Sequence, residues 1–267
     1  ERRSADFDLG RSPFLRRALA PRSLRAIRMA VLAGFAAVIA LSLFRPAHTA
    51  GQVANAVIWS AWEPLLFASF FIFGRVWCTV CPLSTAGKAL GRLFSFQRPP
   101  PEWLKQQGSV ILIFGFAAII WSEHWFVMPE NPVPSGVLLL CLFAAAALFS
   151  VLYRREAWCR YACPLGGVGA AYSLPGMLTV KANAHVCANY CTTYDCYRGT
   201  EEKGGCPVYR HPLHDADSHN CKLCLSCLDI CPHGATKLYL RPPLMSVWHA
   251  GPLGETILLF SFFLFFF

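Results

Sequence analysis

Five long apolar stretches constrain the fold of this chain more than any other feature. They cover about residues 28–44, 54–74, 109–128, 136–153 and 253–267. A helix needs roughly 20 apolar residues to cross a bilayer, so the first and fourth stretches are slightly short and the last is clearly short. Hydrophobic residues form 55% of the 267 residues and charged residues only 15%, a balance unlike that of an ordinary soluble domain. We therefore expect an α-helical integral membrane protein with about five transmembrane helices.

The two ends of the sequence suggest that it belongs to a longer protein. The last apolar stretch ends in Phe-Phe-Phe with no closing charge or loop, and the chain starts with Glu1 rather than Met. We expect further residues on both sides, with more transmembrane helices after residue 267.

The basic residues are distributed unevenly and predict a topology. Residues 1–28 hold eight Arg, residues 75–107 hold five Lys or Arg, and residues 154–241 hold ten, whereas the two intervening loops hold only Arg45. Lys and Arg near the ends of membrane helices are retained in the cytoplasm. If four helices alternate in direction, the N-terminus and residues 155–241 are both cytoplasmic. This topology also accounts for the net charge of +9, so we expect no nucleic-acid partner.

The 13 cysteines indicate metal or redox chemistry. Cys141 stands alone in an apolar stretch and is expected to be a small buried hydrophobic residue. The other twelve fall in three groups on the side predicted to be cytoplasmic. Because the cytoplasm is reducing, thiols clustered there favour metal ligation or redox work over structural disulfides.

Residues 221–232 read C-K-L-C-L-S-C-L-D-I-C-P. This C-x2-C-x2-C-x3-C-P run is the ligand spacing of a bacterial-type [4Fe–4S] site, whose fourth cysteine serves a second cluster. An earlier set with C-x3-C-x4-C spacing is less regular, and Cys206 and Cys231 both precede Pro. Two structural zinc sites with four thiolates each are the alternative. The crossed assignment gives group A (Cys206, Cys221, Cys224 and Cys227) for cluster A and group B (Cys187, Cys191, Cys196 and Cys231) for cluster B.

Four further cysteines form a repeated motif. Trp-Cys78-Thr-Val-Cys81-Pro-Leu follows the second apolar stretch, and Trp-Cys159-Arg-Tyr-Ala-Cys163-Pro-Leu follows the fourth. These membrane-end cysteines are candidates for a third redox centre, either iron or iron–sulfur, or for dithiol–disulfide pairs. Helix-ending Cys-Pro turns with inert thiols are the remaining interpretation.

Glu63 is a candidate proton acceptor in a quinol site. It lies inside the second apolar stretch, where a carboxylate is costly enough to suggest a function, and the adjacent Pro64 is expected to disturb the helix. A position at the interface, or a helix cap, is the alternative. Among the cytoplasmic histidines, His233 directly follows Cys231-Pro232 and is a candidate to tune a cluster potential.

The doubled Cys-x2/3-Cys-Pro motif on membrane helices, followed by ferredoxin-type cysteine sets, is similar to the NapH and NosR group of membrane polyferredoxins, including the related CcoG proteins. The resemblance covers roughly residues 28–240. It implies [4Fe–4S] clusters on the cytoplasmic side of a bacterial inner membrane, and electron transfer from quinol or another donor to a reductase or a metal centre under assembly. The first repeat has two residues between its cysteines where the family commonly has three. Residues 1–28 are too short for the flavin-binding region of NosR-type proteins.

These observations predict an electron-transfer protein. The sequence has no dinucleotide fingerprint after a strand, no Walker loop and no catalytic triad in context, and we assign no catalytic residue. The expected partners are the lipid bilayer, quinol and other redox subunits. A metal-centre assembly factor, such as a metal reductase resembling CcoG, and a redox-sensing regulator are the alternatives. The expected segments are a basic N-terminus (1–27), a four-helix membrane domain (28–180), a ferredoxin-like domain with two clusters (181–241) and the start of a fifth membrane helix (242–267).

Overall fold

The computed structural model describes residues 7–9, 17, 19–94, 96–201, 203–214, 221–244 and 247. These residues are mostly helical, and the chain divides into two compact units. The helical unit comprises Leu24–Ala68 and Val80–Gly167, and the cysteine-rich unit comprises Glu1–Ser23, Ser69–Thr79 and Val168–Phe267. Each unit is described by itself.

Among the described residues, four helices are long and apolar enough to cross a membrane. They are α2 (Pro21–Phe44), the continuous helix formed by α3 (Thr49–Ala56), η2 (Val57–Trp62) and α4 (Glu63–Phe73), α7 (Glu102–Trp125) and α8 (Pro132–Leu152). Each begins several residues before the apolar stretch that predicted it, because helical hydrogen bonding continues through a more polar first turn. The expected fifth helix, at 253–267, lies outside the described residues and stays a prediction.

The second candidate span contains a π-helical segment, η2, directly before Pro64. The N–H of Glu63 donates to the carbonyl of Ile58, five residues earlier. Proline has no N–H and its ring crowds the carbonyl four residues before it, and a widened turn is one way in which a helix accommodates such a residue. The disturbance expected at Pro64 is therefore present as a π turn.

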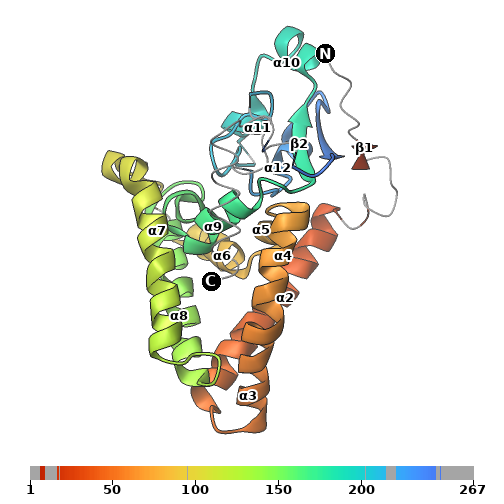
Figure 1. Ribbon diagram of the computed structural model, residues 1–267. Helices are drawn as coiled ribbons and strands as arrows, with labels where there is room; N and C mark the ends of the chain where they lie inside the picture. Colours follow the sequence, from red (N-terminus) through yellow and green to blue (C-terminus); the bar gives the residue numbers. More distant parts are fainter. Residues whose placement is uncertain are drawn as a thin grey trace. The chain divides into compact units, whose positions relative to one another are not determined.

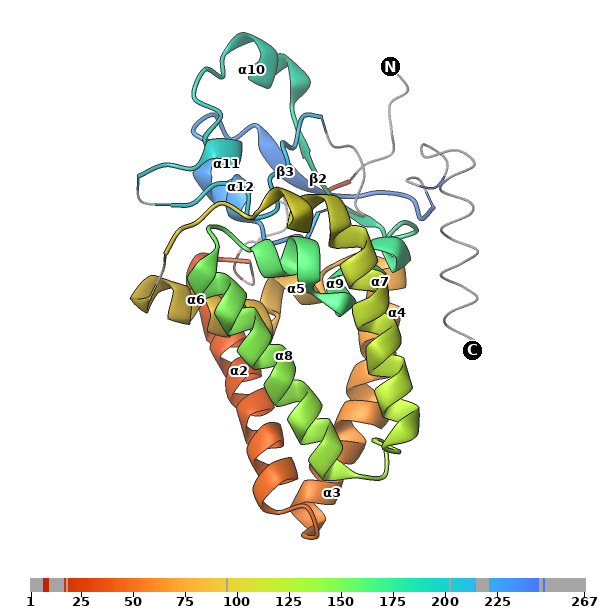
Figure 2. The ribbon, with the colours of Figure 1, turned by 90° about the vertical axis from the view of Figure 1, so that its left-hand side faces the viewer.

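A polar cluster fastens this span to the turn between α7 and α8. The side-chain amide of Asn55 donates to the carbonyls of Met128 (3.0 Å) and Pro129 (2.8 Å). The indole N–H of Trp59 donates to Ser135 Oγ at 2.9 Å, and that hydroxyl donates to Met128 O at the same distance. Figure 2 shows α7 and α8 diverging from this turn.

Helix α6 (Pro82–Leu93) packs on α8 through glycine. A Cβ added at Gly87 would overlap the Ser150 hydroxyl, and one at Gly91 would lie 2.9 Å from the Ser150 carbonyl. The close approach therefore requires glycine at both positions. Beside it lies a small apolar core of Leu83, Ala146, Trp158, Ala162 and Cys163.

The cysteine-rich unit is built on a three-stranded antiparallel sheet in the order β1-β3-β2 (Figure 1). The strands are β1 (Phe7–Asp8), β2 (Leu178–Ala182) and β3 (Thr236–Leu240), with Val180 opposite Leu238. Along β3, Thr236 and Leu238 are buried and Lys237 is exposed, the alternation of a strand with one covered face. Three short helices, α10 (Ala184–Asn189), α11 (Asp195–Arg198) and α12 (Ser226–Ile230), each carry one cysteine.

Residues 69–79 join this unit through hydrogen bonds and close backbone packing. The N–H of Met177 donates to Ile72 O at 3.0 Å, and the rings of Phe71 and Tyr172 meet edge to face at 5.0 Å. Gly74 adopts φ +82°, and a Cβ at Gly176 would lie 2.6 Å from the nitrogen of Gly74. The residues before the first Cys-Pro motif are thus part of the cysteine-rich unit, as are the residues of β1 near the N-terminus.

Candidate metal-cluster site

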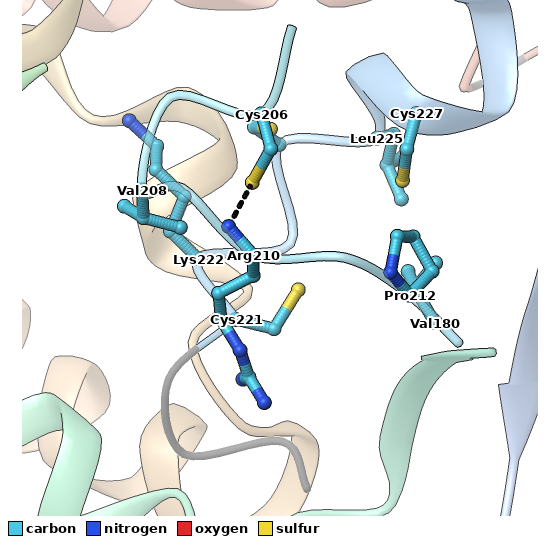
Figure 3. Close-up of a pocket in the computed structure, with 10 residues that line it drawn as sticks. Val180, Cys206, Val208, Arg210, Pro212, Cys221, Lys222, Leu225 and Cys227 are labelled. Carbon is cyan, nitrogen blue, oxygen red and sulfur yellow. Dashed lines mark hydrogen bonds between the residues drawn. The ribbon is translucent and has the colours of Figure 1, made fainter. Parts of the chain in front are cut away.

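The four cysteines of group A line one pocket of the cysteine-rich unit. Figure 3 shows the sulfur atoms of Cys206, Cys221 and Cys227 around this pocket. The chain turns sharply between the ligands because Leu223 (φ 50°) and Leu225 (φ 62°) adopt left-handed backbone conformations. Such conformations are unfavourable for Leu, and outliers of this kind concentrate at functional sites. The other residues that line the pocket are Val180, Val208, Arg210, Pro212, Lys222 and Leu225.

The environment of group A opposes free thiolates. Burial raises the pKa of Cys221 to about 11, and the charges of Cys224 and Cys206 act in the same direction. Burial also raises the pKa of Cys227 well above its ordinary value, again with contributions from the other three thiols. Thiolates gathered at this pocket therefore need positive charge between them, which a bound metal centre supplies.

Donors and cations around group A suit sulfur that carries negative charge. The N–H of Arg210 donates to Cys206 Sγ at 3.3 Å (Figure 3). The charge of Arg210 acts against the effect of burial and offsets part of the rise in the pKa of Cys221. Lys222, which is 2% exposed, lines the same pocket. Hydrogen bonds and charges of this kind tune metal–sulfur centres.

The thiols of group B also act on one another. Burial and, to a smaller extent, the charges of Cys231, Cys191 and Cys187 together raise the pKa of Cys196 to about 11. The pKa of Cys187 is raised by burial and then by Cys191 and Cys231. The N–H of Ala235 donates to Cys231 Sγ at 3.3 Å. Cys231 therefore lies with the earlier set, while Cys206 lies with the later one.

The two groups are neighbours. The charge of Cys196, in group B, contributes to the raised pKa of Cys227, in group A. This grouping follows the crossed spacing of two-cluster ferredoxins. None of the 13 cysteines, all of which lie in the described residues, forms a disulfide, and in the same residues no three His, Cys, Asp or Glu side chains converge closely enough to form a metal site. The chemistry of the donors, four thiols per group with N–H groups directed at sulfur, fits an iron–sulfur cluster; that each group holds one stays a prediction.

One histidine contacts a candidate ligand, and the sequence did not single it out. His211 Nε2 lies 3.6 Å from Cys196 Sγ, and the ring packs near Tyr194 and His214. His233, the residue expected to tune a cluster, is exposed. The spacing along the chain carries no signal for the His211 contact, because it depends on how the loop after Cys206 folds back.

The two Cys-Pro repeats end in the same way despite their different spacing: an extended cysteine is followed by a proline that begins a helix. In the first, α5 (Trp77–Val80) leads to Cys81 in an extended conformation (φ −53°, ψ 126°), and Pro82 begins α6. In the second, the π-helical segment η3 (Trp158–Ala162) leads to Cys163 (φ −74°, ψ 110°), and α9 (Pro164–Tyr172) follows. The Cys163 N–H donates to Trp158 O at 2.8 Å, a span of five residues. The π turn thus absorbs the extra residue of the second repeat.

Three of the four membrane-end cysteines surround one apolar core. Cys163 belongs to the core of the helical unit that contains Trp158, and Cys81 and Cys159 pack against it. Cys78 belongs to the cysteine-rich unit. There its neighbour Thr79 donates from Oγ1 to the carbonyl of Leu223 at 2.6 Å, inside group A's ligand run.

A buried carboxylate links the two repeats within the helical unit. Glu156 is 8% exposed and accepts a hydrogen bond from Ser84 Oγ (2.8 Å). Lys88 Nζ lies 2.9 Å from Glu156 Oε1, and Cys159 Sγ donates to Oε2 at 3.4 Å. Ser84 and Lys88 lie on α6, which follows the first repeat, whereas Glu156 precedes the second. No pattern in the sequence predicts this contact.

Two other residues differ from or extend the expectations. Cys141 is exposed rather than buried, because it lies on a surface of α8 that no described part of the chain covers. Glu63 is partly buried, and the charge of Glu123 on α7 acts on it. Glu123 was missed because only the fold brings it near Glu63. The quinol role of Glu63 stays a prediction.

Comparisons with known proteins agree with the cysteine chemistry. A family model described as "4Fe-4S binding domain" matches residues 55–101 and 135–176, and each range contains one Cys-Pro repeat. The "Putative electron transport protein YccM" of Escherichia coli (strain K12) is 27% identical over 201 residues, which cover 64% of this chain and 54% of the relative. The chain thus spans about half the length of this relative. No solved structure matches. The chain therefore carries a 4Fe-4S binding domain and is a distant homologue of YccM.

Proposed function

We propose that this chain is a multi-pass membrane protein that relays electrons through two [4Fe–4S] clusters, held by groups A and B. The observation that carries the proposal is the presence of two groups of four thiols, of which group A lines one pocket and includes Cys227, whose pKa is raised in part by the charge of Cys196 in group B. When bound, each cluster would accept and donate one electron at a time. The name of the relative as an electron transport protein supports the same class of function.

The residues of the chain have identifiable roles in this proposal. The left-handed turns at Leu223 and Leu225 bring three cysteines of one run to the lining of one pocket. Apolar side chains such as Val180 and Val208 limit the access of water. N–H groups that donate to Cys206 and Cys231 stabilise extra negative charge on sulfur, and they therefore favour the reduced state.

A membrane location is supported by the exposed apolar surface of the four long helices. Only 11–17% of the residues in their apolar windows are buried within the chain. Lipid would cover the remaining surface, and the helices would satisfy their own backbone groups. We infer from the distribution of Lys and Arg that the cysteine-rich unit and the N-terminus face the cytoplasm of a bacterial inner membrane.

The membrane-end cysteines are proposed to hold a third iron or iron–sulfur centre. The two ranges that match the 4Fe-4S family model contain these four cysteines and Cys141 but none of groups A and B. Metal analysis of Cys78→Ser and Cys159→Ser distinguishes this centre from a dithiol. A dithiol predicts unchanged iron in both variants, whereas a third centre predicts less.

Quinol is the proposed electron donor or acceptor on the membrane side, and Glu63, with Glu123 acting on it, is the proposed proton acceptor. A carboxylate inside a membrane helix is a functional candidate by default, and the π turn at η2 leaves local backbone geometry unlike that of a regular helix. Partner redox subunits would receive or supply the electrons at the cysteine-rich unit. Stoichiometric copurification with such a subunit, and loss of quinol-dependent cluster reduction in Glu63→Gln, are the expected results.

The central test is anaerobic purification with iron and sulfide analysis and EPR of the reduced protein. Two clusters correspond to about eight iron atoms in groups A and B. Cys224→Ser is expected to remove one EPR signal and Cys191→Ser the other, whereas Cys141→Ser, on the exposed surface of α8, should leave both. Zinc in place of iron, with no reducible centre, would refute the proposal.

A further inference from the structure

Helix α6 and the residues that follow it present an apolar surface to the outside of the helical unit. Leu93, Phe94 and Phe96 are 72%, 67% and 64% exposed. The opposite side of α6, at Leu83 and Gly87, is buried against the core and α8. The C-terminal end of α6 therefore has a second apolar side, which the described parts of the chain leave exposed.

The exposed phenylalanines are fixed at the end of a candidate membrane helix. The N–H of Phe96 donates to Val151 O at 2.9 Å, and that of Arg98 donates to Leu152 O at 3.2 Å. The N–H of Arg154 donates in turn to Arg98 O at 2.9 Å. Because α8 ends at Leu152, this strip (residues 96–98) lies at the level where the apolar helix gives way to charged residues.

Cationic side chains surround these apolar residues. Arg92, Arg98 and Arg154 are exposed, and the Arg98 guanidinium lies over the Phe96 ring, 5.6 Å from its centre. Residues 80–101 contain no Asp or Glu. Guanidinium groups bind phosphate through paired hydrogen bonds, and a helix with an apolar side and basic residues lies in the interface of a bilayer. A phospholipid matches both kinds of residue at the membrane boundary, because its acyl chains can contact the phenylalanines and its phosphate can bind the arginines. A protein partner would have to supply both kinds of contact at the same level.

We propose that α6 and the strip through Arg98 form an interfacial anchor that binds anionic phospholipid. Leu93, Phe94 and Phe96 enter the region between headgroups and acyl chains, and Arg92 and Arg98 hold the lipid phosphate. This inference rests on the proposed membrane location. It adds a site of direct lipid recognition, which would fix the depth of α6 and so the height at which Cys81 stands relative to the bilayer.

The apolar contact is tested with a photoreactive benzoylphenylalanine in place of Phe94 in the full protein, reconstituted in nanodiscs. Irradiation is expected to attach a phospholipid at this position, seen as a mass increase of the peptide. Tyr190, 63% exposed at the end of α10, is the matched control and should not capture lipid. Membrane extraction with alkaline carbonate is measured in parallel. Protein that resists extraction but captures no lipid at position 94 refutes the anchor, whereas extracted protein refutes the proposed membrane location.

The headgroup contact is tested in nanodiscs that mix phosphatidylglycerol with phosphatidylcholine. Capture at position 94 is expected to enrich phosphatidylglycerol severalfold over its share of the lipid. The double change Arg92→Gln and Arg98→Gln should reduce the captured lipids to their bulk ratio, and Arg45→Gln, an exposed arginine after α2, should not. Free inorganic phosphate at millimolar concentration should leave the enrichment intact if a lipid phosphate is the ligand. Capture at the bulk ratio in the unsubstituted protein would refute binding of anionic lipid.

Discussion

The hydrogen bond from Thr79 to the carbonyl of Leu223 offers a sharp test of how the first Cys-Pro repeat supports group A. The distance is 2.6 Å, and the two residues are 8% and 2% exposed. Thr79→Val keeps the shape of the side chain and removes the donor. Loss of one partner from a buried hydrogen bond costs about 1–3 kcal/mol. Because Leu223 holds an unfavourable left-handed conformation (φ 50°), we expect this cost to appear as local opening of the ligand run.

The assay follows iron release from the reduced, anaerobic protein to a chelator. If release requires transient opening of the ligand run, a loss of about 1.4 kcal/mol makes it about tenfold faster. Only the EPR signal assigned to group A should decay faster, and the signal of group B should keep its rate. Thr85→Val is the matched control, since it removes a hydroxyl hydrogen bond of 2.9 Å to the carbonyl of Cys81, the residue before α6. Equal release rates in Thr79→Val and the unsubstituted protein, or an equal acceleration in Thr85→Val, would refute the reasoning.

Three further predictions concern other contacts. His211→Phe removes the imidazole beside Cys196 Sγ and is expected to lower the midpoint potential of cluster B in an EPR-monitored titration, with little effect in cluster A; an unchanged potential contradicts it. Burial raises the pKa of Cys196 and Cys221 from 9.0 to about 11, which favours the neutral thiols in the fold. The stability that the metal-free protein gains from these neutral thiols should therefore be present below pH 9 and be lost as the pH rises through 11. The denaturation midpoint should fall over this range, and a midpoint that does not change with pH would contradict the prediction. Glu156→Gln removes the ion pair with the partly exposed Lys88 and should destabilise the protein by about 1 kcal/mol in thermal unfolding, with Lys105→Gln as a surface control.

Much of the helical architecture follows from hydropathy, but the helix starts do not. The apolar signal begins at about residue 28, whereas α2 begins at Pro21. Hydropathy detects where side chains avoid water, and backbone hydrogen bonding continues through residues such as Arg22 and Arg25, whose long side chains can extend to the polar side. The fifth apolar stretch cannot be compared in this way.

The sheet of the cysteine-rich unit had no sequence signal. Strand β1 contains two residues, and it pairs with Tyr239 and Leu240 at the other end of the chain. A period of two cannot be recognised in a two-residue segment, and pairing across this separation depends on the fold as a whole.

The division of the cysteines into groups A and B is a prediction that ligand spacing alone allows, whereas their surroundings could not be predicted. Ligand spacing is a local constraint, because three thiols on a short run can reach one centre, and so the division into groups A and B follows from the sequence. The contacts of Glu156 with Ser84 and of His211 with Cys196 join residues from separate segments. Such contacts depend on helix packing and loop path, for which spacing carries no information.

The π turn at Trp158–Ala162 accommodates one additional residue in a helical turn. The Cys-Pro unit therefore has a tolerance for length: an insertion between the two cysteines is taken up as a wider turn, and the cysteine before the proline keeps its conformation. Removal of Ala162 should convert this turn into an α-turn like that at Trp77–Val80 and leave the Cys163–Pro164 step in register. When such motifs are aligned or designed, the step to proline is the fixed point, and the number of residues before it is free to vary by one.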